Sequence, residues 1–223
     1  MIALLVMTDG RGHCIEETIP AALEHLTPSY LITTRVIHDD SADPTYTAWL
    51  EETFPDWQVI GGSFRRGFGG AIQNAWAWLR AQAPEPYVFH LEDDFLIQRD
   101  VHLDRMAEVL RWQTHLHQLA LLRGPVNQAE RDAGGVIEQH PDDYRLGLQV
   151  GVGGWREHRR FWTTNPSLYR STLMRRGWPD GADSEGHFGL ELFAEDPQAH
   201  AAFWGTEGVW CDHVGHQRVG TGY

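Results

Sequence analysis

The chain has 223 residues, of which 42% are hydrophobic and 22% are charged, so its length fits one domain with a full core or one domain with a small appendage. Its 18 basic and 31 acidic residues give a formal net charge of −13, which opposes non-specific binding to nucleic acid or to an anionic membrane. Two cysteines, Cys14 and Cys211, are too few for a disulfide framework or a cysteine-rich zinc site. The apolar run at residues 2–7 is too short for a signal peptide or a membrane span, so we expect a cytoplasmic protein that does not interact with a membrane.

Apolar runs and helical periodicity alternate along the first 122 residues. Residues 2–7 form an uninterrupted apolar run that ends at a glycine-rich turn, as in a strand of a parallel sheet that is covered on both faces. The alternation of strands and helices predicts an α/β sandwich with a mostly parallel central sheet. The expected strands are residues 2–7, 30–37, 57–60, 88–91 and 119–122, and the expected helices are residues 15–26, 45–54, 70–81 and 102–112.

After about residue 123 the periodicity weakens, and Gly, Pro, Trp and His become more frequent. Residues 124–160 show little regular pattern, so we expect loops or a hairpin there. A long irregular stretch in a compact domain is usually functional, often as a lid or as a loop that contacts a substrate. Because the sequence shows neither an internal repeat nor a convincing linker, we predict a single domain, 1–223, with two halves, 1–122 and 123–223.

Three consecutive carboxylates, Glu92, Asp93 and Asp94, follow the predicted strand at residues 88–91. Acidic side chains beside a core are unfavourable unless a positive charge lies near them, and a divalent cation with oxygen ligands supplies such a charge. Ligands of open α/β sheets bind at the carboxyl ends of the strands. The triplet therefore predicts a site for a metal ion and a diphosphate, although on the triplet alone a solvated acidic turn is an equally good interpretation.

Other segments accompany the triplet in chain order: Thr8-Asp9-Gly10-Arg11, His38-Asp39-Asp40-Ser41-Ala42-Asp43, Gly67-Phe68-Gly69-Gly70-Ala71-Ile72-Gln73-Asn74-Ala75 and Thr164-Asn165-Pro166-Ser167-Leu168-Tyr169-Arg170. Together with Glu92-Asp93-Asp94 as an E-D-D form of the D-x-D motif, they resemble the glycosyltransferase A-type fold, especially the family-two-like glycosyltransferases. The resemblance is good over residues 1–110 and patchy over residues 160–223. Ser41 follows Asp40 without the usual glycine, and the Gln-x-x-Arg-Trp segment of processive synthases is missing, which argues against a processive enzyme.

The resemblance implies an α/β fold of the glycosyltransferase A type, a Rossmann-like sandwich in which residues 1–122 bind a nucleotide sugar and residues 123–223 form an irregular half that binds the acceptor. It also implies Mn²⁺ or Mg²⁺ as a cofactor, since a divalent ion stabilises a leaving diphosphate as a Lewis acid. Asp94 is the expected metal ligand. His213 is a candidate second ligand, although a structural role for this histidine is nearly as good an interpretation.

A nucleotide sugar, with a UDP-linked donor favoured, is the expected substrate of the first half. Arg11 could contact the base or the diphosphate, whereas Asp9 and Asp39 could face the nucleoside or cap a following helix. Glu92 and Asp93 could bind ribose hydroxyls or metal-bound water. The expected donor-binding residues are Thr8, Asp9, Arg11, Asp39, Asp40, Arg66, Gly69, Gly70, Asn74, Glu92 and Asp93.

Inverting sugar transfer needs a general base that removes the proton of the acceptor hydroxyl. We expect this base in the first turn of a helix that Ser184 or Asp183 caps, and we choose Glu185. Glu191 and Asp183 are the alternatives. Glu185 could instead only complement the dipole of its helix.

The acceptor-binding residues are expected in the second half, where tryptophans are concentrated. Aromatic faces suit sugars or bases by stacking, although core packing is the more common fate of a tryptophan. The candidates are Trp155, Trp162 and Asn165.

These residues predict a metal-dependent, nonprocessive glycosyltransferase that moves a sugar from a nucleotide-diphosphate donor to an acceptor hydroxyl, with inversion implied by the resemblance. A nucleotidyltransferase of related fold and a noncatalytic protein that binds a sugar or a partner are the alternatives. The sequence leaves the acceptor open among a small molecule, a glycan, a protein and a modified DNA base, and it leaves the oligomeric state unknown.

Overall fold

The computed structural model describes residues 1–181 and 183–215. Its α-helices are α1 (Gly12–His25), α2 (Pro44–Thr53), α3 (Gly67–Gln82), α4 (Leu103–Trp112), α5 (Gln128–Ala133) and α6 (Ser184–Glu195). Its strands are β1 (Ile2–Thr8), β2 (Leu26–Thr27), β3 (Ile32–Asp39), β4 (Gln58–Gly61), β5 (Tyr87–Glu92), β6 (Phe95–Ile97), β7 (Val101–His102), β8 (Leu116–Leu121), β9 (Arg145–Gln149), β10 (Gly153–His158), β11 (Ser167–Arg170), β12 (His200–Trp204) and β13 (Cys211–His213).

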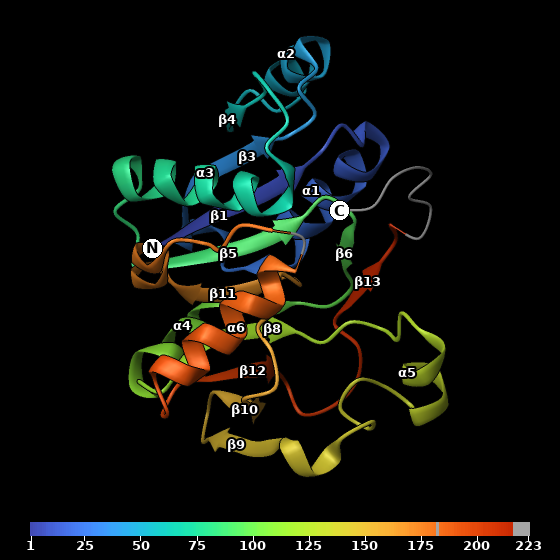
Figure 1. Ribbon diagram of the computed structural model, residues 1–223, viewed down its shortest axis with the longest axis vertical. Helices are drawn as coiled ribbons and strands as arrows, with labels where there is room; N and C mark the ends of the chain where they lie inside the picture. Colours follow the sequence, from blue (N-terminus) through green and yellow to red (C-terminus); the bar gives the residue numbers. More distant parts are fainter. Residues whose placement is uncertain (182, 216–223) are drawn as a thin grey trace.

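A mixed sheet with the order β4-β3-β1-β5-β11-β8-β12-β10-β9 forms the centre of the molecule (Figure 1). Its first four strands are parallel to one another. Strand β11 lies antiparallel between β5 and β8, and β10 lies antiparallel between β12 and β9. All other strands of the sheet point the same way, so the predicted α/β sandwich with a mostly parallel sheet is confirmed.

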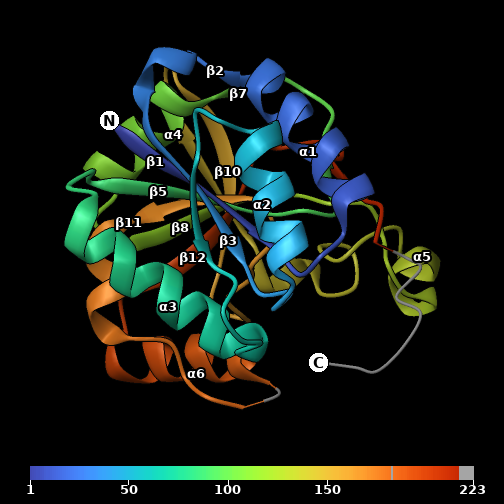
Figure 2. The same cartoon turned by 90° about the horizontal axis from the view of Figure 1, so that it is seen from above.

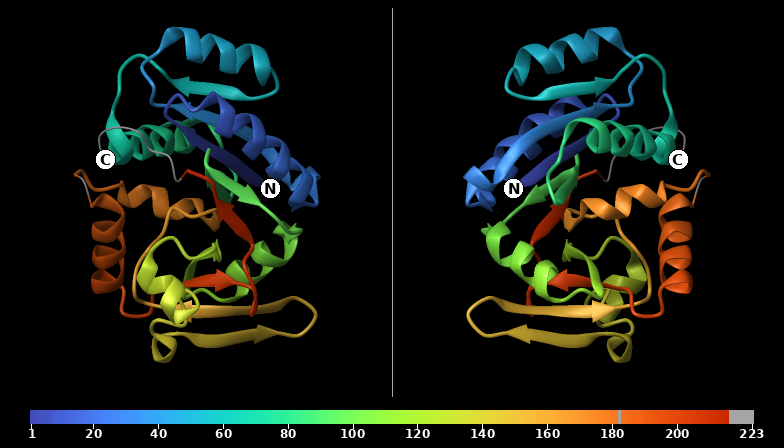
Figure 3. Two further views of the ribbon diagram at one scale, coloured as in Figure 1. Left: turned by 90° about the vertical axis from the view of Figure 1, so that its right-hand side faces the viewer. Right: turned by 90° about the vertical axis from the view of Figure 1, so that its left-hand side faces the viewer.

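Helices cover both faces of the sheet, as the apolar pattern of the first strand predicts. Helices α3 and α6 lie on one face, and α1 and α4 lie on the other (Figures 2 and 3). Alternate side chains of β1 point into two separate cores because successive residues of a strand face opposite sides. Leu4 joins the core beneath α1 and α4, whereas Leu5 joins the core beneath α3 and α6.

Most predicted boundaries agree with the structure to within a few residues, but the second strand begins later than expected. Residues Ser29–Leu31 form a 3-10 turn, in which the backbone N–H of Leu31 donates to the carbonyl of Pro28 at 3.1 Å. Tyr30 therefore lies outside the strand and is 78% exposed. An aromatic residue at the start of an apolar run favours a strand, but here the 3-10 turn occupies the positions where the strand was expected to begin.

The second half contains more regular structure than the sequence predicts. Residues 124–160 include the expected hairpin, formed by β9 and β10, but also the short helix α5. Strands β11 and β12 insert into the main sheet on either side of β8. The two halves of the chain are thus joined in one sheet.

Parallel strands bring their carboxyl ends to one edge of the sheet. At this edge the N–H of Asp40 donates to the carbonyl of Thr8 at 2.9 Å, and the N–H of Asp93 donates to the carbonyl of Met7 at 2.9 Å. Strand β13 returns to the same region by pairing with β6, opposite Phe95. In the part of the chain that the structure describes, no helix is long and apolar enough to span a bilayer.

Candidate functional site

Three carboxylates surround the guanidinium of Arg11 beyond the ends of β1 and β5. Its Nε lies 2.9 Å from Asp9 Oδ1, its Nη1 donates to Asp94 Oδ2 at 2.5 Å, and its Nη2 donates to Asp93. The side chains of Asp93 and Asp94 are fully buried. We call Asp9, Asp93 and Asp94 the acid cluster. Its compactness is explained by Arg11, because buried carboxylates need a nearby positive charge.

The acidic residues of the E-D-D segment differ in proton affinity. Burial, together with the charge of Asp94, raises the pKa of Glu92 to about 8. Burial also raises the pKa of Asp93 to about 7, against the charge of Arg11 and a hydrogen bond from Thr8 Oγ1 at 2.6 Å. Burial opposes ionisation of Asp94 as well, but the hydrogen bond from His213 and the charge of Arg11 lower its pKa to about 2. Asp94 is therefore ionised throughout the neutral range.

Asp94 and His213, the two predicted metal ligands, lie close together. Nε2 of His213 lies 3.3 Å from Asp94 Oδ2, and the imidazole is stacked on Phe95 with ring centroids 4.7 Å apart. Within the described residues, Asp94 Oδ1 is buried without a hydrogen-bond partner, so the carboxylate has unused capacity to accept a bond. Carboxylate and imidazole are ligand types that Mn²⁺ accepts, so the side chains of Asp94 and His213 fit the divalent ion that the resemblance implies. In the described residues, no group of three or more His, Cys, Asp or Glu side chains is arranged to hold a metal ion.

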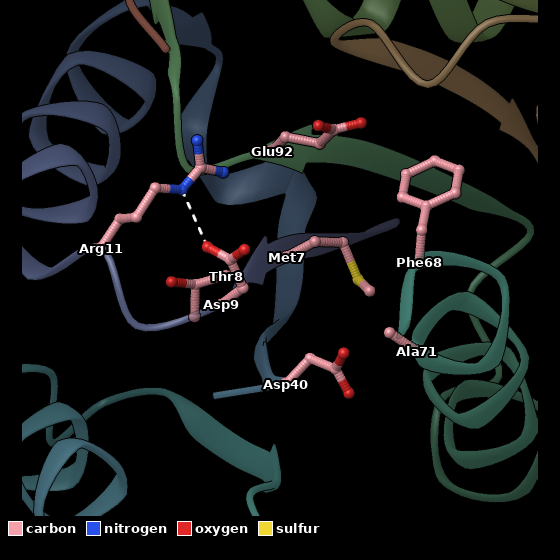
Figure 4. Close-up of a pocket in the computed structure, with 8 residues that line it drawn as sticks. All are labelled: Met7, Thr8, Asp9, Arg11, Asp40, Phe68, Ala71 and Glu92. Carbon is pink, nitrogen blue, oxygen red and sulfur yellow. Dashed lines mark ion pairs between the residues drawn. The ribbon is translucent and has the colours of Figure 1, made fainter. Parts of the chain in front are cut away.

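A small cavity of about 30 Å³ opens beside the acid cluster (Figure 4). In Figure 4, Arg11 and Asp9 approach it from one side and Phe68 from the other. Several predicted donor-binding residues therefore do lie together. The lining residues are Met7, Thr8, Asp9, Arg11, Asp40, Phe68, Ala71 and Glu92.

The remaining acids of the second strand hold local structure. Asp39 is fully buried, and its carboxylate accepts from Ser41 N at 2.8 Å and from Thr47 Oγ1 at 2.6 Å. Asp40 lines the small cavity, but its oxygens accept from the N–H groups of Arg66 and Gly67 at 2.7 and 2.9 Å. Asp39 thus supports the loop after its strand, and Asp40 fixes the start of α3.

Other predicted donor-binding residues serve packing around α3. A Cβ at Gly69 would lie 3.0 Å from the carbonyl oxygen of Pro179, so this glycine permits close approach of another segment. A Cβ at Gly70 would meet the Cβ of Arg66 at 3.0 Å. Asn74 Oδ1 lies 3.1 Å from His38 Nε2. The guanidinium of Arg66 lies over the ring of Phe64, 4.0 Å from its centroid.

A second cavity of about 760 Å³ adjoins the small one, and Phe68 and Glu92 line both. It lies between the acid cluster and the second half of the chain, and its size suits an organic substrate. Its lining mixes aromatic and acidic side chains. The lining residues are Phe68, Glu92, Phe95, Arg123, Val126, Glu130, Val136, Phe161, Trp162, Thr163, Thr164, Asn165, Asp183, Glu185, Gly186, Phe203, His213 and Gly215.

Of the three candidate bases, Glu185 has the most suitable surroundings. It lies in the first turn of α6, lines the large cavity and accepts hydrogen bonds from Thr164 N at 2.5 Å and Thr164 Oγ1 at 3.2 Å. Burial raises the pKa of its carboxyl. Asp183 lines the cavity but is exposed, and Glu191 is exposed further along α6. A partly buried carboxylate with a raised pKa is suited to accept a proton near neutral pH.

The predicted acceptor-binding residues are divided between the core and the cavity. Trp155 is 2% exposed, packs in the core and donates to Glu157 Oε1 at 2.8 Å, so we do not retain it in the site. Gly147 faces its ring, since a Cβ there would lie 2.2 Å from Trp155 Nε1. Trp162 is also buried, but it lines the large cavity together with Asn165.

The buried pair Arg123–Glu130 is a part of the cavity wall that the sequence analysis missed. Arg123 Nη1 donates to Glu130 Oε2 at 2.7 Å and Nη2 donates to Oε1 at 3.2 Å, while Val126 N and Asn127 Nδ2 donate to the same carboxylate at 2.9 Å. These bonds fold residues 123–130 into a rigid wall. The spacing of Asn127 and Glu130 is a helix-capping signal that could have revealed this turn.

The α/β fold with its large, mostly parallel sheet matches that of solved glycosyltransferases. Residues 1–349 of TarS from S. aureus match with a TM-score of 0.62 at 15% identity, over 96% of this chain and 60% of that chain. The same fragment in complex with UDP-GlcNAc matches with a TM-score of 0.60 at 15% identity, over 98% and 61%. The mannosyltransferase PcManGT from Pyrobaculum calidifontis, in complex with GDP-Man and Mn²⁺, matches with a TM-score of 0.65 at 17% identity, over 97% and 57%.

These likenesses show the fold, and the chain spans about three fifths of the matched chain in each of these three structures but only 36% of a longer TarS chain. No protein-family model matches the sequence, and no curated protein matches it either.

Proposed function

We propose that this protein transfers a sugar from a nucleotide-sugar donor to a hydroxyl group of an acceptor. The observation that carries the proposal is the junction of the two cavities at Glu92 and Phe68, with the acid cluster on one side and Glu185 on the other. A donor whose diphosphate reaches the mouth of the small cavity and an acceptor bound in the large cavity would meet at this junction. The nucleotide sugars in the complexes of the structural neighbours support the donor class.

Each side of the junction has a distinct role in this proposal. Thr8, Asp9 and Arg11 bind the nucleoside diphosphate, and Asp94 with His213 would hold a divalent ion. When bound, this ion supplies Lewis-acid stabilisation of the leaving diphosphate. Glu185, oriented by Thr164, accepts the proton of the attacking hydroxyl, and attack from the side opposite the diphosphate inverts the sugar carbon.

Release of nucleoside diphosphate from UDP-GlcNAc, UDP-glucose and GDP-mannose tests the proposal, with Mn²⁺, Mg²⁺ or EDTA present. Glu185→Gln removes the proton acceptor at nearly constant shape, so we expect release to fall by about 10²- to 10⁴-fold. Glu191→Gln is the matched control, because Glu191 is exposed on the same helix. It should retain the wild-type rate.

A thermal-shift assay with the same compounds separates binding from turnover, because a ligand that binds the folded state raises the melting temperature. Binding without release by the wild-type protein would favour a noncatalytic sugar-binding role. Neither binding nor release, with any donor and with or without metal, would contradict the proposed function.

A further inference from the structure

Arg11 and His213 approach the same oxygen atom of Asp94. Arg11 Nη1 donates to Asp94 Oδ2 at 2.5 Å, and His213 Nε2 lies 3.3 Å from that oxygen. Two adjacent ligands of an octahedral ion, each at about 2.1 Å, are about 3 Å apart. A divalent ion shared by Asp94 and His213 would therefore meet the oxygen that Arg11 now holds.

The guanidinium and a divalent ion repel each other when both contact one carboxylate oxygen. Both are positive, and the side chain of Asp94 is fully buried, so water screens their repulsion only weakly. The side chain of Arg11, by contrast, can move away from Asp94, because it is 20% exposed and lines the small cavity beside Asp9. A diphosphate bound at the mouth of that cavity would offer the guanidinium a bidentate anionic partner.

We propose, on the basis of the proposed function, that Arg11 and the divalent ion compete for Asp94, and that the donor diphosphate relieves the competition by drawing Arg11 away. Arg11 is then the residue that makes metal binding depend on the nucleotide. Without nucleotide Arg11 itself supplies the positive charge that the acid cluster contacts. With nucleotide it binds the diphosphate and leaves Asp94 to the metal.

This arrangement predicts a thermodynamic coupling that Mn²⁺ binding can measure. The free Mn²⁺ signal in electron paramagnetic resonance gives the affinity of the wild-type protein, of Arg11→Gln and of Arg160→Gln, each with and without UDP. Arg160 pairs with exposed Asp143, so its variant controls for the loss of one positive charge. By linkage, UDP must raise Mn²⁺ affinity by the same factor as Mn²⁺ raises UDP affinity.

We expect UDP to raise the Mn²⁺ affinity of the wild-type protein and of Arg160→Gln by at least about tenfold, the size of a typical coupling. Arg11→Gln should bind Mn²⁺ at least about tenfold more tightly than the wild type without UDP, and UDP should add little. Unchanged or weaker Mn²⁺ binding by a folded Arg11→Gln variant would overturn the proposal.

Arg11→Lys covers the case in which Arg11→Gln does not fold. A lysine keeps the charge but lacks the planar fork with which arginine reaches three carboxylates, so the Mn²⁺ affinity of this variant should lie above that of the wild type. An affinity equal to or below that of the wild type would overturn the competition. If no protein binds Mn²⁺ even with UDP, the competition fails, whereas release of UDP from a donor in EDTA would leave the proposed transfer reaction standing.

Discussion

The hydroxyl of Thr164 affects the proton affinity of Glu185, because it donates to the carboxylate from 3.2 Å and so favours the ionised form. Thr164→Val removes the hydroxyl and keeps the shape and the backbone N–H donor. The pKa of Glu185 should then rise further, and the acidic limb of the kcat/KM profile should move to higher pH. A pH–rate profile checks this, and a limb that stays in place would assign the base to another residue.

His158 makes the folded state sensitive to acid. It is 3% exposed among the rings of Tyr144, Phe161 and Phe203, and burial, followed by the charge of Arg160, lowers its pKa to about 3. An unfolded histidine titrates at about 6.5, so between about pH 6.5 and pH 3 the unfolded chain binds the proton more readily. The contribution of His158 to stability is therefore lost as the pH falls through this window.

His158→Phe keeps a ring in this aromatic cluster and removes the titration. As the pH is lowered from 6.5 to 4.5, the free energy of unfolding of the variant relative to that of the wild type should rise by up to about 1.4 kcal/mol per pH unit. Urea unfolding at several pH values measures the difference. A difference that does not depend on pH would mean that His158 is protonated in the folded state as readily as in the unfolded chain.

At the scale of elements, the position of α6 depends on the close approach of one residue to a neighbouring loop. A Cβ at Gly189 would lie 2.6 Å from the backbone nitrogen of Trp162. Gly189→Ala should therefore push α6 away from the segment that ends at Thr164. Thr164 donates hydrogen bonds to Glu185, so this shift would weaken those bonds. We expect a loss of about 1–3 kcal/mol in stability and a lower rate of donor turnover.

Gly186→Ala is the matched control, because the atoms nearest to a Cβ there belong to the side chain of Asp183, at 2.8 Å or more. That carboxylate can move, and alanine favours a helix over glycine by about 1 kcal/mol. Thermal unfolding of both variants compares them. Equal destabilisation by the two substitutions would show that the contact with Trp162 does not decide how α6 packs.

The sequence predicts the elements of the first half well because their apolar patterns are local. The strand before Glu92 and the acids that follow it are readable for the same reason, and parallel strands then place Asp9 and Asp93 at one edge. What local pattern cannot supply is the partner of a side chain. The donors that occupy Asp39 come from a nearby turn and from α2, and Glu185 meets Thr164 across 21 residues of chain.

The tryptophans of the second half illustrate the same limit. Trp155 and Trp162 are alike in sequence terms and each packs in a core, yet Trp162 also lines the large cavity. Whether Trp155 faces the core depends on how β10 pairs with β12 and β9. The residues of β10 alone do not specify this pairing. The place of β11 between β5 and β8 is likewise set by long-range pairing.

At the scale of the whole molecule, one continuous sheet predicts one cooperative unfolding transition. Trp76 belongs to one core and Trp155 to the other, so tryptophan fluorescence reports on both, whereas far-ultraviolet circular dichroism follows the backbone. The two signals should have the same midpoint in urea. Separate midpoints would show that the two cores unfold independently.

Strand β11 also covers an open edge of the sheet late in synthesis. Strand β5, which carries Glu92 and leads into Asp93, has an unpaired edge until residues 167–170 leave the ribosome and pair with it. The nascent chain must therefore keep an exposed edge strand, and the carboxylates beside it, away from neighbouring polypeptides. A ribosome-bound chain arrested before residue 167 should be cut by protease near β5, and completion of the chain should protect it.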